Sequence, residues 1–295
     1  MATASSFVTK QVQSSDGLTI YAEAVGDSSK PAVVFVHGFM LSGAVWDNLF
    51  LDPTLLSSVY MVRYDVRGEG RSGKPTSSDG YASALFAADY QAVASAFGVK
   101  NPVLVGWSLG ATAAADIIAN INPNPLAGIF YVAPLPYINE TLIEACASAL
   151  LQSFLGPLTS DTDVTTSLST RVAFGNALFI NPDAIPWEER FEWNGMGLSM
   201  GPFECSSATS RPQDGGPLLA AGQAGLPTMI VAASNDQQVV TQSAINALQP
   251  YFTNLTTATI QNAGHAAHID NQSAYVQLLT TFVKQVNKHR RGGHH

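Results

Sequence analysis

A serine lies between two glycines at residues 106–110, in the pattern Gly-x-Ser-x-Gly centred on Ser108. So short a pattern also arises by chance, and the chain repeats it around Ser199. Only Ser108 follows a strand-like apolar run, residues 102–107, and precedes an alanine-rich helical stretch. In that context the glycines permit a sharp turn that lifts the serine hydroxyl clear of the sheet edge. We therefore expect Ser108 to be a nucleophile; the alternative is a serine that only begins a helix.

A serine nucleophile needs a general base, and histidine is the usual one. His265 follows a strand-like run, residues 255–263, and precedes the final helical stretch, so we expect it on a loop after a strand. His268 lies one turn further along and is expected to be a packing or solvent residue. The other histidines begin an early loop or lie in a basic, glycine-containing tail: His37, His289, His294 and His295. We therefore expect His265 to be the base.

The base in turn needs a carboxylate that fixes its tautomer and stabilises its charged form. Between Gly215 and His265 the sequence holds one carboxylate, Asp236, directly after the strand-like run 227–233. The other natural position follows the run 128–132, but the next acid there is Glu140, beyond two prolines. The chain order Ser108, Asp236, His265 is one of the known orders of a catalytic triad. The alternative for Asp236 is an isolated surface carboxylate in a turn.

Two further patterns are weighed and set aside. A metal site built on His265, His268 and Asp270 lacks convincing further ligands in the sequence. Residues 68–75 contain Gly-x-Gly-x-x-Gly and resemble a phosphate-binding loop, but Pro75 stands where that loop needs Ser or Thr. The residues that follow are turn-like, whereas phosphate binding needs a helix that begins at the glycines. We expect a shaped structural loop there, with no metal and no cofactor.

Composition limits the partners. The chain has 295 residues, a net charge of -8 and only 12% charged residues, against about a quarter in an average soluble protein. Nucleic acids and acidic membranes are therefore poor partners, and a small-molecule substrate is expected. The two cysteines are expected to be ordinary buried residues: Cys146 and Cys205.

The start of the chain lacks the features of a signal peptide, and no membrane span is visible in the sequence, which predicts a soluble, cytoplasmic protein. Three Asn-x-Ser/Thr patterns keep secretion open: Asn139, Asn254 and Asn271. The oligomeric state is left open.

Short apolar runs alternate with helical stretches, which predicts an α/β fold with a mostly parallel, doubly wound sheet. Strands are expected at residues 18–25, 32–36, 59–65, 102–107, 128–132 and 227–233. Helices that pack on the sheet are expected at residues 82–97 and 272–286, where apolar positions recur at helical spacing.

This alternation stops at residues 134–212, which have helical pieces and an aromatic concentration. We expect a core of residues 1–133 and 213–295 and an inserted, mainly helical cap over Ser108. Substrate-binding residues are expected beside the nucleophile and in the insertion: Trp107, Trp187, Phe191, Trp193, Met196 and Phe203. The alternative is that these aromatics only form the insertion's own small core. The charged run around residues 188–192 is expected to be a solvated helix face.

Four signatures together resemble the α/β-hydrolase fold superfamily, in its capped, esterase-like serine hydrolase subgroup. They are His37-Gly38-Phe39, Asp65-x-Arg67-Gly68-x-Gly70-x-Ser72, the turn at Ser108, and Gly264-His265 followed by Asp270. The resemblance covers residues 7–133 and 213–288, and the insertion carries no matching motif. It implies that the backbone N–H groups of Phe39 and Leu109 form the oxyanion hole. Family members usually have Glu where Asp270 stands.

The expected chemistry is acyl transfer through a covalent intermediate on Ser108, with a small, uncharged, moderately hydrophobic ester or lactone as substrate. Thioester, peroxyacid and some carbon-carbon cleavages use the same triad, so the reaction class is better defined than the substrate. Epoxide hydrolases and haloalkane dehalogenases resemble the sequence elsewhere but use Asp at position 108. A small-molecule receptor and a hydroxynitrile lyase-like enzyme of the same fold are the alternatives.

Overall fold

The computed structural model of the chain describes residues 7–292, and within that range eight strands form a single sheet. The strand order is β1-β2-β4-β3-β5-β6-β7-β8. The first two pairs, β1 with β2 and β2 with β4, are antiparallel, and all later pairs are parallel. The strands are β1 (Val8–Gln13), β2 (Thr19–Val25), β3 (Ala32–Val36), β4 (Tyr60–Tyr64), β5 (Val103–Trp107), β6 (Gly128–Val132), β7 (Thr228–Ala233) and β8 (Leu255–Ile260).

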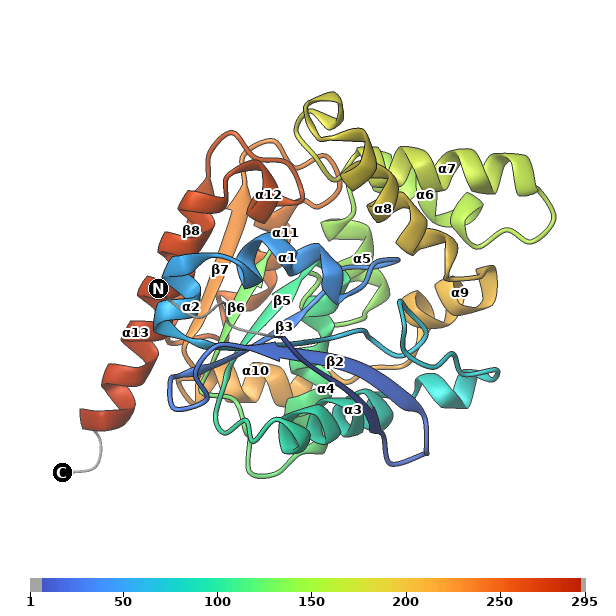
Figure 1. The fold of residues 1–295 in the computed structure, drawn as a ribbon. Coiled ribbons are helices and arrows are strands. Elements are labelled where there is room, and N and C mark those ends of the chain that lie inside the picture. Colours follow the sequence, from blue (N-terminus) through green and yellow to red (C-terminus); the bar gives the residue numbers. More distant parts are fainter. Residues whose placement is uncertain (1–6, 293–295) are drawn as a thin grey trace.

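Helices cover both faces of the sheet (Figure 1). One face carries α3 (Ser83–Ala96), α4 (Ala113–Asn120), α10 (Gly216–Gln223) and α11 (Thr241–Leu248). The other face carries α1 (Asp47–Phe50), α2 (Pro53–Ser58) and α13 (Gln272–Gly292), and the short helix α12 (Ala267–Asp270) precedes α13. Successive strand side chains point to opposite faces: Val33 and Phe35 enter one hydrophobic cluster, and Val34 and Val36 enter the other. The predicted doubly wound, mostly parallel α/β fold is confirmed.

All six predicted strands and both predicted sheet-packing helices are present, with ends that differ by a few residues. The further run 255–263 contains β8. The edge strand β1 was not predicted, because its sequence VTKQVQ is polar and its side chains are mostly exposed. Cys146 and Cys205 are buried and unpaired, as expected. Among the described residues, no helix is both long and apolar enough to cross a membrane.

Residues 134–212, here called the cap segment, lie between β6 and α10 and form helices at one end of the sheet (Figure 1). They are α5 (Glu140–Cys146), α6 (Ala149–Leu158), α7 (Val164–Asn176), α8 (Trp187–Leu198) and α9 (Pro202–Ser210). Polar side chains accept from backbone N–H groups at three helix starts: Asn139, Ser148 and Asp163. The Ser148 cap explains why the predicted helical piece 140–155 is divided in two. The division of the chain at residues 134 and 212 into domains stays a prediction.

Candidate active site

Ser108 lies on a tight, strained turn at the end of β5. Its φ is 55°, in the left-handed region that non-glycine residues rarely adopt. The flanking glycines are required sterically: a Cβ on Gly106 would lie 2.6 Å from the Ala111 Cα, and a Cβ on Gly110 would clash with the His37 carbonyl. This conformation directs the serine side chain to the cavity described below, which Ser108 lines. The second copy of the pattern, around Ser199, lies at the end of α8 with its hydroxyl donating to the Met196 carbonyl.

Asp236 and His265 follow neighbouring strands, β7 and β8, and their side chains are in contact. The Oδ2 of Asp236 lies 2.8 Å from the Nδ1 of His265. The His265 side chain is 1% exposed and that of Asp236 is 4% exposed, so water competes little for this hydrogen bond. With its proton on Nδ1, the imidazole presents Nε2 as a base. The indole of Trp107 donates to the His265 carbonyl at 3.0 Å, which ties this loop to the residue before Ser108.

The loop that follows β3 lies directly against the serine. A Cβ on Gly38 would be 3.3 Å from the Ser108 Cβ, so a larger residue there would press on the nucleophile. Phe39, the next residue, lines the same cavity as Ser108 and Leu109. Phe39 and Leu109, the residues expected to form the oxyanion hole, therefore both lie at the same cavity as Ser108.

His37 shapes this loop and is not available as a base. The Val66 N–H donates to its Nε2 at 3.0 Å, and its Nδ1 donates to the Gly38 carbonyl at 2.8 Å. Burial lowers the pKa of His37, which keeps the ring neutral. Both ring nitrogens are thus committed to the backbone.

His268 is a packing residue, as one of the two sequence expectations had it. Its ring lies 4.5 Å from that of Trp46, 4.9 Å from Trp107 and 5.8 Å from Trp193, measured between centroids. Its Nε2 donates to the Val45 carbonyl at 3.1 Å. Burial lowers the pKa of His268 to about 3, so the ring is neutral in the physiological range.

Asp270 joins the loop of His265 to the cap segment. Its Oδ2 accepts from the Gly264 N–H at 2.7 Å and from the Ile180 N–H at 3.0 Å. A further bond runs from the Ala266 N–H to the Leu178 carbonyl at 2.7 Å. Both flanks of His265 are therefore held by the cap segment. The shorter Asp, where Glu is usual in the family, makes these bonds.

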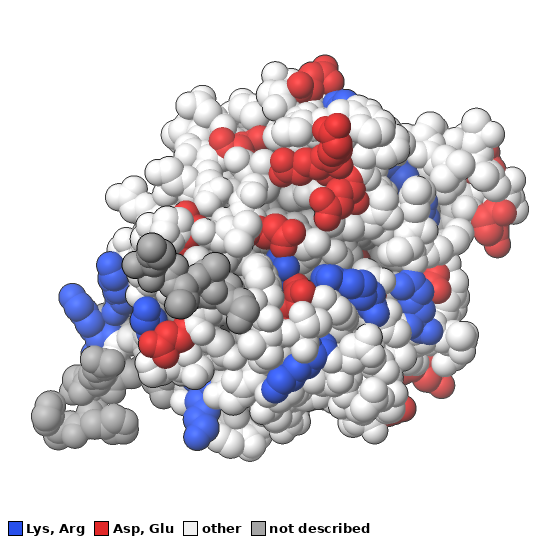
Figure 2. Space-filling view, in the orientation of Figure 1, with Lys and Arg blue, Asp and Glu red and all other residues white. Residues whose placement is uncertain are grey.

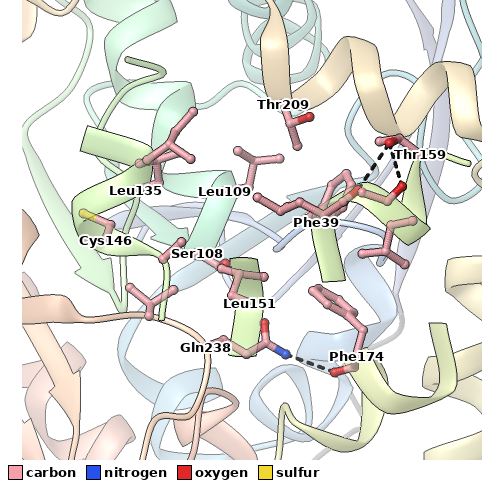
Figure 3. A pocket seen from close by; sticks show the side chains of 16 residues that line it. Phe39, Ser108, Leu109, Leu135, Cys146, Leu151, Thr159, Phe174, Thr209 and Gln238 are labelled. Atoms are coloured by element: carbon pink, nitrogen blue, oxygen red, sulfur yellow. Dashed lines mark hydrogen bonds between the residues drawn. The ribbon is translucent and has the colours of Figure 1, made fainter. Parts of the chain in front are cut away.

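A cavity of about 360 Å³ opens beside Ser108, between the sheet and the cap segment (Figure 3). Its wall is mostly aliphatic and aromatic, and no charged side chain contributes to it. The lining residues are Phe39, Ser108, Leu109, Leu135, Ile143, Cys146, Ala147, Leu151, Leu155, Gly156, Leu158, Thr159, Phe174, Thr209, Gln238 and Val239. The cap segment, chiefly α5 and α6, contributes most of them.

None of the six expected substrate-binding residues lines this cavity, and their role in substrate binding stays a prediction. Trp187 and Phe191 are 58% and 56% exposed and stack on each other on the outside of α8, and Phe203 is 44% exposed. Trp107 and Trp193 are buried and pack together behind the site. The remaining residue, Met196, accepts a hydrogen bond on its sulfur from the Ser42 hydroxyl. Aromatic content identified the cap segment but could not show which face each helix turns inward.

A usable signal was present in a neighbouring stretch. Ile143, Ala147, Leu151 and Leu155 recur every four residues, which is the spacing of one helical face. All four line the cavity, although the helix is interrupted between α5 and α6. Gln238 and Val239 were missed because they follow Asp236 in a loop, where no periodicity marks an inward side chain.

The acidic run on α8 forms a solvated face, as expected. Glu188, Glu189 and Glu192 line an open groove together with Asp47. Figure 2 shows acidic side chains gathered in the upper part of the molecule. Within residues 7–292, no three His, Cys, Asp or Glu side chains gather as a metal site would need. His294 and His295 lie outside the described residues.

Comparisons with known proteins agree with the fold. A model of the alpha/beta hydrolase family matches residues 33–278. Over 126 residues the chain is 35% identical to a non-heme chloroperoxidase of Streptomyces lividans, an alignment that covers 42% of this chain and 44% of that protein. Over 125 residues it is 32% identical to a bifunctional esterase/perhydrolase of Acinetobacter calcoaceticus, with the same coverage of 42% and 44%. The chain therefore matches less than half the length of these curated relatives.

The solved structure of an esterase from Rhodococcus sp. ECU1013 superposes with a TM-score of 0.83 at 25% identity, and the match covers 94% of this chain and 99% of that one. The match thus includes nearly all of the sheet and the cap segment. On the strength of the sheet, the strained serine turn and a family match over most of its length, the chain belongs to the alpha/beta hydrolase family.

Proposed function

We propose that the protein is a serine hydrolase that cleaves small, uncharged, moderately hydrophobic esters or lactones. The observation that carries the proposal is the 2.8 Å contact between Asp236 and His265, next to a cavity that contains Ser108 on a strained turn. A carboxylate, a buried imidazole and a serine that follow β7, β8 and β5 of one sheet are the three groups that acyl transfer by a triad uses. The similarity to proteins named as esterases supports the same reaction class.

In the proposed mechanism, the Ser108 hydroxyl attacks the carbonyl carbon while Nε2 of His265 takes its proton. The carbonyl oxygen becomes an oxyanion, which accepts hydrogen bonds from the backbone N–H groups of Phe39 and Leu109. The intermediate collapses, the alcohol leaves with the proton from His265, and the acyl group stays on Ser108. Water then attacks the acyl-enzyme by the same steps in reverse and releases the acid. Asp236 orients the imidazole through its hydrogen bond and stabilises the imidazolium as it forms.

The cavity supports a neutral substrate. No charged side chain lines it, so an anionic or cationic group would lose its hydration there without a compensating partner. A volume of about 360 Å³ is at the small end of the range for ligand pockets, which fits small esters and lactones.

The test combines covalent labelling with product analysis. A serine-directed phosphonate should label the peptide that contains Ser108, and neutral esters or lactones should yield the corresponding acid and alcohol by mass spectrometry. Labelling of Ser199, or products in which a carbon-carbon or carbon-cyanide bond is broken in place of an ester bond, would contradict the proposal.

A further inference from the structure

Gln238 places a polar amide in the otherwise apolar wall of the cavity. The residue is 1% exposed and lines the cavity together with Ser108. A buried amide group is retained at little cost only when its hydrogen-bonding atoms are satisfied. The partners of each of its atoms therefore show what it offers to a ligand.

Three hydrogen bonds fix Gln238 in place. Its backbone N–H donates to the Oδ1 of Asp236 at 2.8 Å, and its backbone carbonyl accepts from the Ser148 N–H at 2.9 Å. Its side-chain Nε2 donates to the Phe174 carbonyl at 3.0 Å. The side chain is thus held between the acid loop, the start of α6 and the end of α7.

The bond to Phe174 also settles which way the amide faces. A backbone carbonyl can only accept a hydrogen bond, so the NH₂ group must face Phe174 and the carbonyl oxygen must face away. Figure 3 shows Oε1 turned away from Phe174. In the described part of the chain, the bonds of Gln238 use its backbone and Nε2, which leaves Oε1 as the acceptor for a ligand.

The other polar lining groups are arranged differently. The hydroxyls of Thr159 and Thr209 donate to carbonyls of their own helices, and both residues are only partly buried. A hydroxyl can rotate, and water can reach a partly buried one. The Gln238 amide is fixed in direction by its bond to Phe174 and belongs to a residue that is only 1% exposed, so an apolar group placed against its oxygen would leave that acceptor unsatisfied.

We propose that Gln238 is a specificity-determining residue that selects substrates with a neutral hydrogen-bond donor, in the simplest case a hydroxyl, near the scissile ester. The donor must be neutral because the cavity wall contains no carboxylate to balance an ammonium group. It is placed near the ester because Gln238 lines the same cavity of about 360 Å³ as Ser108. The inference rests on the proposed ester hydrolysis and narrows its substrate class to hydroxylated esters and lactones.

The experiment compares matched ester pairs. Ethyl butyrate and ethyl 3-hydroxybutyrate differ by a hydroxyl on the acyl side, and butyl butyrate and 3-hydroxybutyl butyrate differ on the alcohol side. The ratio of kcat/KM for the hydroxylated and plain ester is measured in the parent, in Gln238→Met and in Thr209→Val. Using a ratio within one protein cancels any general loss of activity from imperfect folding.

In at least one pair, the ratio should fall about tenfold in Gln238→Met, the equivalent of one lost hydrogen bond in a buried site, and should stay within about twofold in Thr209→Val. An unchanged ratio in both pairs for Gln238→Met, or an equal fall in Thr209→Val, would overturn the inference.

A binding measurement separates this inference from the proposed reaction. The Kd of the same four esters is measured by calorimetry on Ser108→Ala and on Ser108→Ala/Gln238→Met. If the parent hydrolyses none of the four esters, the proposed ester hydrolysis is contradicted for these substrates. The inference then stands if the second substitution removes the preference for a hydroxylated ester, and falls if it does not.

Discussion

The carboxylate of Asp236 holds His265 with one oxygen and its own loop with the other. Oδ2 lies 2.8 Å from the His265 Nδ1, while Oδ1 accepts from the Gln238 and Val239 N–H groups at 2.8 and 2.9 Å. The second pair of bonds prevents the carboxylate from rotating away from the imidazole. The orientation of His265 therefore depends on the backbone after β7 as well as on its hydrogen bond to Asp236.

Asp236→Asn is expected to lower kcat by up to about ten-thousandfold, because an amide can favour the wrong tautomer of His265 and cannot stabilise imidazolium. Turnover of a neutral ester is the measurement. Asp183→Asn serves as the control, since that side chain is 89% exposed. Comparable losses in both variants would contradict the assignment of Asp236.

Ser108→Ala is expected to abolish ester turnover, with a loss of about a millionfold, because the residual rate then comes from binding and the oxyanion hole alone. The half-buried serine contributes little packing, so the circular dichroism spectrum and melting temperature should stay close to those of the parent. Ser199→Ala is the matched control from the second copy of the pattern and should keep nearly full activity. Retained turnover in Ser108→Ala would remove the proposed nucleophile.

The cavity wall predicts where chain-length preference is set. Leu151→Trp should fill part of the cavity and depress kcat/KM for longer acyl chains more than for short ones, since each excluded methylene forfeits about 0.8 kcal/mol of binding. Leu150→Trp changes the adjacent residue, which is 36% exposed and absent from the wall, and should leave the profile unchanged. Trp187→Ala should also leave it unchanged. If Trp187→Ala changed the dependence of kcat/KM on acyl chain length and Leu151→Trp did not, substrate binding would have to be assigned to α8.

Glu69 is expected to make the fold less stable as pH rises. Burial raises its pKa to about 8, although hydrogen bonds from the Met40 and Leu41 N–H groups oppose the shift. Between pH 4.5, near the ordinary pKa of a glutamate, and pH 8, the unfolded chain has released a proton that the folded chain retains. The free energy of unfolding therefore falls by up to about 1.4 kcal/mol per pH unit in that window.

Glu69→Gln should remove this slope, so its stability relative to the parent should rise between pH 5 and pH 8. Urea unfolding at the two pH values measures it, with the exposed Glu188→Gln as control. If the difference in the free energy of unfolding between Glu69→Gln and the parent were the same at pH 5 and pH 8, Glu69 would already be ionised in the folded protein.

His268 acts in the opposite direction and at lower pH. Its pKa of about 3 in the fold lies below the ordinary value of 6.5, so the unfolded chain binds a proton that the folded chain excludes between these values. Stability is therefore fully present above about pH 6.5 and is lost as pH falls towards 3, by up to about 1.4 kcal/mol per unit. His268→Gln should flatten this acid limb in urea unfolding at pH 7 and pH 5, while His265→Gln should abolish activity. Acid sensitivity that is unchanged in His268→Gln would contradict a neutral, buried ring.

Most of the fold and the central residues of the candidate site could be predicted from local sequence. Apolar runs, the glycines around Ser108 and the single acid before His265 each limit the local backbone or the possible partners. The edge strand β1 and the lining of the cavity depend on tertiary packing instead. Trp187 and Phe191 stack on each other outside the cavity. The number of aromatic residues in the cap segment could not predict this arrangement. Gln238 points inward because Phe174, Ser148 and Asp236 hold it, and those partners are distant in sequence or bonded through the backbone.

Asp270 connects the cap segment to the loop of His265, because its carboxylate accepts from the N–H groups of both Ile180 and Gly264. If the part of the cap segment around residues 178–180 moved outward, the bond from the Ile180 N–H to Asp270 and the bond from the Ala266 N–H to the Leu178 carbonyl would break, while the bond from Gly264 to Asp270 would remain. Such a movement would remove the direct support that the cap segment gives to this loop. Residues 178–180 therefore couple the position of the His265 loop to the position of the cap segment.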